Sequence, residues 1–180
     1  MPQLSIAGPV QDACDAGSKL YKQKKYDEAL KQFNQAVKLD TKCMVARFYR
    51  GAIYIEQDDK AKAITEFNDA LKVDPKNSIA YINLGRIYES QAHFQLAVDN
   101  YSKAIELQPK QVLPYYQRGG AHAELKQYAK AVNDFTSAIQ LEPKNPNAYI
   151  DRAMMYSKMG KEDLSAKDRQ KAKELQAAKP

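Results

Sequence analysis

Apolar positions recur at helical spacing along the chain, in pairs of segments separated by short polar turns. The segment 78–91 carries apolar residues three and four positions apart, and the segment 94–107 repeats this spacing after a turn. Such spacing predicts two amphipathic helices. Asp74–Pro75 and Gln108–Pro109 mark helix ends, because proline lacks a backbone donor and disfavours the helical conformation of the residue before it. The pattern therefore predicts pairs of helices separated by proline-containing turns.

The pattern repeats with a step of 34 residues along nearly the whole chain. A small residue occupies the first helix of each pair, and an aromatic residue occupies the second helix of four pairs. These positions are Gly17, Gly51, Gly85, Gly119 and Ala153, with Phe33, Phe67, Tyr101 and Phe135. A glycine inside a helix costs about 1 kcal/mol relative to alanine, so it requires a packing reason. Close approach of the partner helix supplies that reason, and the regular step predicts a solenoid.

These residues resemble the tetratricopeptide repeat, a helix–turn–helix unit with small residues where its helices touch and a proline before the next unit. The resemblance implies an all-α fold, a right-handed α-solenoid of about ten antiparallel helices. A flexible segment is expected at 1–9, a single domain at 10–177 and a tail at 178–180. The helix–turn–helix repeats are expected at 10–43, 44–77, 78–111, 112–145 and 146–177.

The fifth repeat departs from the others and is expected to be a capping repeat. Arg169 stands where the preceding repeats have an aromatic residue, and its neighbours are rich in lysine. A terminal repeat needs a polar outer face, because no further repeat covers it. The helix expected at 162–175 keeps an apolar stripe of Leu164, Ala166, Ala172 and Leu175.

Composition and charge are those of a soluble protein. Of the 180 residues, 44% are hydrophobic, and the formal net charge is +6. The basic excess lies in the first and last repeats and is interpreted as aiding solubility, the alternative being an acidic or nucleic-acid partner. No stretch approaches a transmembrane span, and residues 1–9 lack the features of a secretory signal. Cys14 and Cys43 are expected to be reduced and structural, in a cytoplasmic protein.

Catalytic chemistry has little support in the sequence. A general base needs a nucleophile and an orienting group within reach, and His93 lies in a turn between helices. His122 is interpreted as a packed substitute for the tyrosine of other repeats, namely Tyr54, Tyr88 and Tyr156. The cysteines and histidines lack the paired spacing of zinc ligands. The sequence therefore predicts no enzyme activity, no metal site and no cofactor.

In the tetratricopeptide repeat family the first helix of each repeat builds the concave face, which implies a peptide-binding groove there. By the repeat step, its residues are Phe48, Ile55, Ile79, Ile82, Asn83, Arg86, Leu113, Tyr116 and Glu124, with Gly120, Ile150 and Met154 at equivalent positions. Contiguous apolar surface commonly marks a binding groove. We expect an apolar or amphipathic segment of a protein partner, anchored by Phe48, Ile82 and Tyr116. The alternative is that neighbouring helices bury several of these residues.

One function known in the family, the binding of a chaperone's C-terminal carboxylate, requires particular residues at particular positions. Some co-chaperones hold the carboxylate tail of heat-shock chaperones with several convergent Lys, Asn and Arg donors. Among the corresponding positions only Asn83 fits, so no carboxylate clamp is expected. The predicted function is a non-catalytic protein-interaction scaffold or adaptor. The rival function is assembly by homo-oligomerisation through the apolar face or the ends of the repeat array.

Three pairs of charged residues are expected to link the two helices of a repeat, and they are Arg50 with Glu66, Arg118 with Asp134 and Arg152 with Asp168. The two remaining repeats have neither the arginine nor the acid. Leu84 and Ala16 stand at the arginine position, and Asn100 and Gln32 stand at the acid position. The acid therefore occurs only where the arginine does. An arginine beside the small residue of the helix contact suits a carboxylate on the facing helix.

Overall fold

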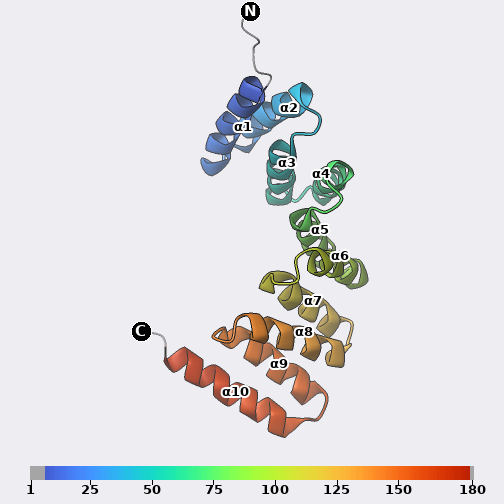
Figure 1. The fold of residues 1–180 in the computed structure, drawn as a ribbon, viewed down its shortest axis with the longest axis vertical. Coiled ribbons are helices and arrows are strands. Elements are labelled where there is room, and N and C mark those ends of the chain that lie inside the picture. Colours follow the sequence, from blue (N-terminus) through green and yellow to red (C-terminus); the bar gives the residue numbers. More distant parts are fainter. Residues whose placement is uncertain (1–6, 179–180) are drawn as a thin grey trace, which may run out of the picture. The chain divides into compact units, whose positions relative to one another are not determined.

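The structure, a computed structural model, describes residues 7–178, and its helices are labelled in Figure 1. They are α1 (Ala7–Lys22), α2 (Tyr26–Leu39), α3 (Met44–Glu56), α4 (Lys60–Val73), α5 (Ser78–Ser90), α6 (Phe94–Leu107), α7 (Val112–Glu124), α8 (Tyr128–Leu141), α9 (Pro146–Lys158) and α10 (Glu162–Ala177). No strand occurs within these residues. The all-α fold of helix pairs predicted from the sequence is confirmed.

The first helix begins earlier than the segment boundaries expected from the sequence. Most of the segment 1–9, expected to be flexible, lies outside the described residues, but α1 already begins at Ala7. The tail at 178–180 also lies largely outside them.

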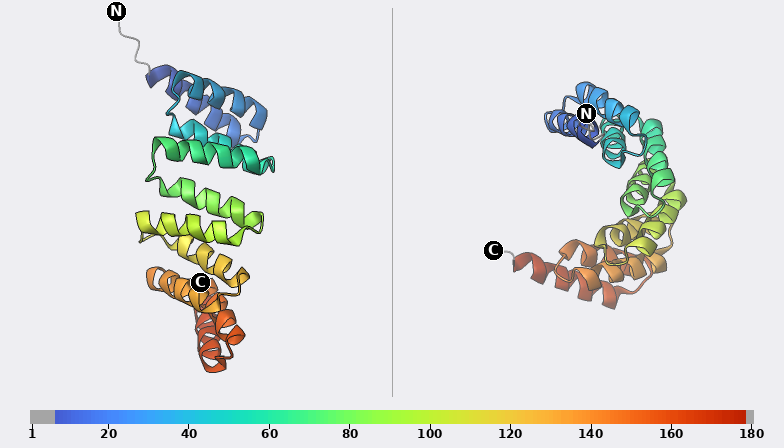
Figure 2. Two further views of the ribbon diagram at one scale, coloured as in Figure 1. Left: turned by 90° about the vertical axis from the view of Figure 1, so that its right-hand side faces the viewer. Right: turned by 45° about the horizontal axis from the view of Figure 1, so that its top comes forward.

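The chain forms two compact units, the first ending at Ala80 and the second beginning at Tyr81. The first unit contains α1 to α4, and the second contains most of α5 together with α6 to α10. The two helices of a repeat pack against each other, as α7 and α8 do, and each repeat of the second unit also contacts the next, through α6 with α7 and α8 with α9. The short turns between consecutive helices can be followed in Figure 2.

Each of the first four repeats is held together by an aromatic ring that lies on the glycine of the facing helix. A Cβ atom added to Gly51 would lie 2.7 Å from the ring of Phe67, and one added to Gly119 would lie 2.9 Å from the ring of Phe135. Real Cβ atoms do not approach so closely, so these glycines are required by packing. In the fifth repeat the exposed Arg169 stands at the position of the ring. The small residue of the facing helix can therefore be an alanine, Ala153. The buried Ser165 instead donates a hydrogen bond to the carbonyl of Ala153, at 2.8 Å.

The turn within each repeat uses one residue in the left-handed conformation. These residues are Lys24, Asp58, Ala92, Lys126 and Gly160, with φ between 57° and 70°. The amide of Ala92 donates to the carbonyl of Glu89, and the amide of His93 donates to that of Tyr88, both at 2.9 Å. This pair of bonds is the Schellman motif, which satisfies the last carbonyls of a helix. Only the fifth repeat has the glycine that this conformation favours.

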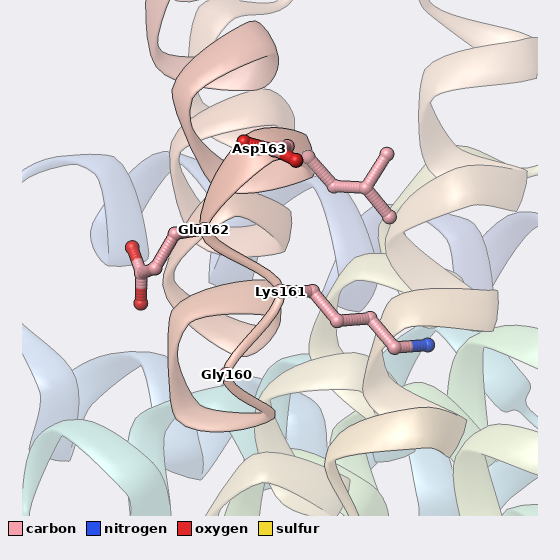
Figure 3. A pocket seen from close by; sticks show the side chains of 5 residues that line it. Gly160, Lys161, Glu162 and Asp163 are labelled. Carbon is pink, nitrogen blue, oxygen red and sulfur yellow. The ribbon is translucent and has the colours of Figure 1, made fainter.

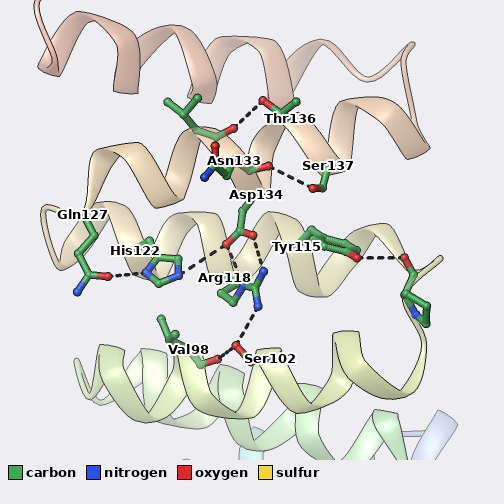
Figure 4. Close-up of polar contacts among 12 residues, drawn as sticks. Val98, Ser102, Tyr115, Arg118, His122, Gln127, Asn133, Asp134, Thr136 and Ser137 are labelled. Carbon is green, nitrogen blue, oxygen red and sulfur yellow. Dashed lines mark hydrogen bonds and ion pairs between the residues drawn. The ribbon is translucent and has the colours of Figure 1, made fainter.

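The ion pairs expected from the sequence are within bonding distance in the structure. Figure 4 shows Arg118 binding Asp134 through both oxygens, with Nε at 2.9 Å from Oδ2 and Nη2 at 2.6 Å from Oδ1. Arg152 binds Asp168 in the same way, at 2.7 and 2.8 Å. Arg50 binds Glu66 through Nη2 alone, at 2.5 Å.

Arg118 and Arg152, the two arginines that bind their acid through both oxygens, each make a third hydrogen bond, to a second partner that sequence analysis missed. Arg118 donates from Nη1 to the hydroxyl of Ser102 on α6, at 2.9 Å. Arg152 does the same to Thr136 on α8, at 3.0 Å. The hydroxyl residue stands 16 positions before its arginine in both cases. Each arginine therefore joins three helices, two of its own repeat and one of the repeat before.

The last helix buries Ala172 and half-buries Leu175, as expected, but not the other half of the expected stripe. Leu164 and Ala166 are exposed, whereas Ser165, Asp168 and Ala172 are buried. The expectation for Leu164 and Ala166 was wrong because Ser165 takes the small-residue position against α9 and Asp168 binds Arg152. The largely polar surface of α10 agrees with a capping helix.

The turn geometry predicts that Ala92→Gly stabilises the protein. A left-handed alanine is strained by about 1–2 kcal/mol, part of which is offset because glycine makes the unfolded chain more flexible. The free energy of unfolding in urea should rise by about 0.5–1 kcal/mol. The matched control is Gly160→Ala, which should lower it by a similar amount. An unchanged or lower value for Ala92→Gly would contradict the assignment of strain.

The two hydrogen bonds between Arg118 and Asp134 predict a strong energetic coupling between these residues. Asp134 is buried, so Arg118→Leu leaves it without a counter-charge and should cost about 2–4 kcal/mol of unfolding free energy, as should Asp134→Asn. A double-mutant cycle should show coupling of about 1–3 kcal/mol. The control pair is Lys103 with Glu106, which is exposed at 2.8 Å and should couple by less than about 0.5 kcal/mol. Equal coupling in the two pairs would refute the special role of the fork.

His122 predicts a loss of stability in acid. It is buried, with Nδ1 at 2.9 Å from Gln127 Oε1 and Nε2 at 3.8 Å from Asp134. Burial lowers the pKa of His122 below its ordinary value of 6.5, against the opposing effect of Asp134. The unfolded chain then binds the proton more tightly than the folded chain does. The free energy of unfolding should therefore fall as the pH drops below about 6.5 and through the lower pKa of the folded state.

The matched variant for this test is His122→Tyr, since Tyr54, Tyr88 and Tyr156 occupy the equivalent positions. Urea unfolding between about pH 7 and pH 5 should show a smaller slope for the tyrosine variant. Identical slopes would show that another group causes the acid sensitivity.

Candidate functional site

The two histidines do not lie in a common site. His93 is exposed at the start of α6, and His122 is packed between Gln127 and Asp134. Among residues 7–178, no three side chains of the metal-binding types gather where they could hold an ion. Within the same part of the chain, no helix is both long enough and apolar enough to span a membrane.

Two hollows of the surface are each formed by one turn. One of about 380 Å³ is lined by residues 160–164. Figure 3 shows that Lys161 points to one side of this turn and Glu162 to the other. A second, of about 520 Å³, is lined by residues 142–146. A hollow built by one short stretch of chain brings few groups together, so neither is a candidate site.

The residues predicted to line a groove divide between the two units. In the first unit, Ile55 and Ile79 are exposed, and the half-buried Phe48 places its ring 5.7 Å from that of Phe67. The groove expected across repeats two to four draws on both units and stays a prediction.

The prediction that Ile82 is an open anchor was wrong. Only 8% of Ile82 is exposed, so the alternative of burial against neighbouring helices applies to it. Asn83 is half-buried, whereas Arg86 and Glu124 are exposed. Sequence position gives the side of the helix on which Ile82 lies but not how deeply its surroundings cover it.

The second unit presents an apolar surface on the first helices of its last two repeats. Leu113 on α7 is 52% exposed, and Ile150 and Met154 on α9 are 36% and 49% exposed. Tyr116 and Gly120 stand one and two turns after Leu113 on the same side of α7. We call this surface the first-helix face, and it consists of Leu113, Tyr116, Gly120, Ile150 and Met154.

A hydrogen bond links the first helices of the last two repeats. The hydroxyl of Tyr116 on α7 donates a hydrogen bond to the carboxylate of Asp151 on α9. A Cβ atom added to Gly120 would lie 3.8 Å from Glu89 Oε1 on α5. The same Glu89 accepts a hydrogen bond from Tyr101 on α6, at 2.7 Å. Asp151 and Glu89 thus place carboxylate groups beside Tyr116 and Gly120, at the edge of the first-helix face.

Tyr116 belongs to both the core and the surface. Its ring meets the edge of the Phe135 ring at 5.5 Å, and its hydroxyl binds Asp151. Burial, followed by the bond to Asp151, raises the pKa of Tyr116, so the hydroxyl stays protonated and keeps donating. Sequence analysis missed this bond, whose partners stand 35 residues apart in different repeats. The half-buried ring remains the fixed centre of the first-helix face.

Comparisons with known proteins agree with this architecture. Models described as tetratricopeptide repeat match residues 14–78, 78–111 and 112–145. No curated protein sequence matches the chain.

Solved structures share the fold at low identity. A crystal structure of MamA protein is 22% identical, with a TM-score of 0.87 over 95% of this chain and 93% of that one. MamA 41-end from Desulfovibrio magneticus RS-1 is 17% identical, with a TM-score of 0.88 over 97% and 99%. YrrB, described as a TPR protein with an unusual peptide-binding site, is 19% identical, with a TM-score of 0.79 over 92% and 86%. With the repeat models matching most of its length, the chain belongs to the tetratricopeptide repeat family.

Proposed function

We propose that the protein is a non-catalytic scaffold that binds an amphipathic helical segment of a protein partner on the first-helix face. The observation that carries this proposal is the exposure of Leu113, Ile150 and Met154 around the fixed ring of Tyr116. Apolar side chains gathered in this way on a soluble protein commonly mark an interaction site. The peptide-binding site described for YrrB supports this use of the fold.

The surroundings of the first-helix face suggest the chemistry of the segment. An amphipathic helix presents apolar residues three and four positions apart, which suits a surface formed by two neighbouring helices. Glu89 and Asp151 place carboxylates near its edge. The exposed Glu124 follows Gly120 by one turn of α7, and the exposed Arg86 is a cation on α5. Oppositely charged groups across an interface improve specificity and the rate of association. We therefore expect the segment to carry lysine or arginine beside its apolar stripe.

The first-helix face predicts which substitutions abolish binding. A library of displayed amphipathic helical peptides, selected on the full chain, supplies the probe, and fluorescence anisotropy measures its affinity. Leu113→Glu and Met154→Glu should each weaken binding at least about thirtyfold, because an apolar anchor contributes about 2 kcal/mol or more. Both side chains are exposed, so the fold should survive. The control is Leu96→Glu on α6, where a leucine of comparable exposure (45%) lies outside the first-helix face.

Three results would contradict this function. Peptides selected without an apolar stripe would remove its chemical basis. Equal losses for Leu113→Glu and Leu96→Glu would show that the surface is not specific. Light scattering across a concentration series tests the rival, self-assembly, and a wild-type oligomer that Met154→Glu converts to monomers would assign the first-helix face to another copy of the chain.

A further inference from the structure

Two free cysteines lie against each other in the first unit. Cys14 is on α1 and Cys43 immediately precedes α3, and their sulfur atoms are 3.5 Å apart. Cys14 is buried and Cys43 is half-buried. The residues stand 29 positions apart in the chain, and Cys43 is the last residue before the first helix of the second repeat. A covalent bond between them would therefore link the first helix of the first repeat to the start of the second repeat.

Neither position has the residue type of its equivalents. The position of Cys14 is occupied elsewhere by Phe48, Ile82, Tyr116 and Ile150, and that of Cys43 by Asn77, Gln111 and Asn145. Asn145 caps α9 by accepting a hydrogen bond from the amide of Asn147, at 3.1 Å, and Asn77 does the same for Ala80. Cys43 makes no such bond to α3. The cysteines replace an apolar side chain and a helix cap, and what they gain is contact with each other.

We propose that Cys14 and Cys43 form a reversible disulfide bond that locks α1 to the start of α3. A disulfide requires its sulfur atoms at about 2.05 Å, so they need to approach by about 1.5 Å. The contact between α1 and α3 already holds both chain segments in place. A low-molecular-weight disulfide such as oxidised glutathione is the oxidant.

The exchange proceeds in two balanced steps. The thiolate of Cys43 attacks one sulfur of oxidised glutathione, forming a mixed disulfide and releasing the first glutathione thiolate. Cys14 then loses its proton to solvent, and its sulfur attacks the Cys43 sulfur and releases the second. Two protein thiols are oxidised by two electrons, and one glutathione disulfide is reduced to two thiols, which take up the protons.

The order of the steps follows from the surroundings of the two sulfur atoms. Burial, followed by the neighbouring Cys43, raises the pKa of Cys14 to about 12, so Cys14 is rarely a thiolate. Cys43 is the more accessible residue and reacts first. Cys14 attacks only after the mixed disulfide has formed beside it, which makes it the resolving cysteine.

The test uses the full chain in glutathione buffers of increasing oxidised fraction. Intact mass spectrometry should show the loss of two hydrogens, and non-reducing peptide mapping should show Cys14 linked to Cys43. The linked chain should unfold at a temperature about 5–10 °C higher than the reduced chain, because the unfolded state is constrained. Cys14→Ser should stop at one glutathione adduct on Cys43, and Cys43→Ser should remain unmodified under the same conditions.

Several outcomes would overturn the proposal. A wild-type chain that stays reduced in fully oxidised buffer would show that the thiols are only packed together. A stable glutathione adduct on Cys43, or a disulfide between two chains, would show that Cys14 cannot resolve the intermediate. A linked chain with an unchanged unfolding temperature would remove the locking role.

Discussion

The contact between an aromatic ring and a bare glycine is the constraint on which the rest of the first four repeats depends. It lets the two helices approach until no Cβ atom fits between them. Arg118 directly precedes Gly119, and Asp134 directly precedes Phe135. The ring that sets the helix spacing therefore also brings the arginine within reach of the acid. The fifth repeat keeps its ion pair without the ring because Ser165 fits closely against Ala153.

The same charge pairing differs between the two units. In the second unit the guanidinium of Arg118 donates two hydrogen bonds to the carboxylate of Asp134, and its remaining nitrogen donates one to the hydroxyl of Ser102. In the first unit, Glu66 is approached by Arg47 and Arg50, yet the Nε atoms of both arginines are buried without a hydrogen-bond partner. Burial raises the pKa of Glu66 in spite of the two arginines. The pairing in the first unit is therefore less well compensated for the loss of water than the fork in the second unit.

Sequence analysis predicted the features that repeat with the chain and missed those that depend on one neighbour. The helix pairs, the close glycine contacts and the three charge pairs follow from matching positions among repeats. The burial of Ile82 did not follow, because helical spacing gives direction and not depth of cover. The hydrogen bond between Tyr116 and Asp151 has no equivalent among the other repeats, so the repeated pattern does not predict it. The role of Ser102 could have been found, since a hydroxyl precedes only the two forked arginines by 16 residues.

The third bond of each forked arginine has a consequence for how the second unit unfolds. Arg152 on α9 reaches back to Thr136 on α8, and Arg118 on α7 reaches back to Ser102 on α6. If α9 and α10 detach, the Thr136 hydroxyl loses its donor and Arg152 loses a partner outside its own repeat. Such nearest-neighbour terms make a repeat array cooperative, because an isolated repeat is less stable than one with a neighbour. Fraying that begins at α10 therefore has to break a polar link at each repeat boundary before it advances to α6.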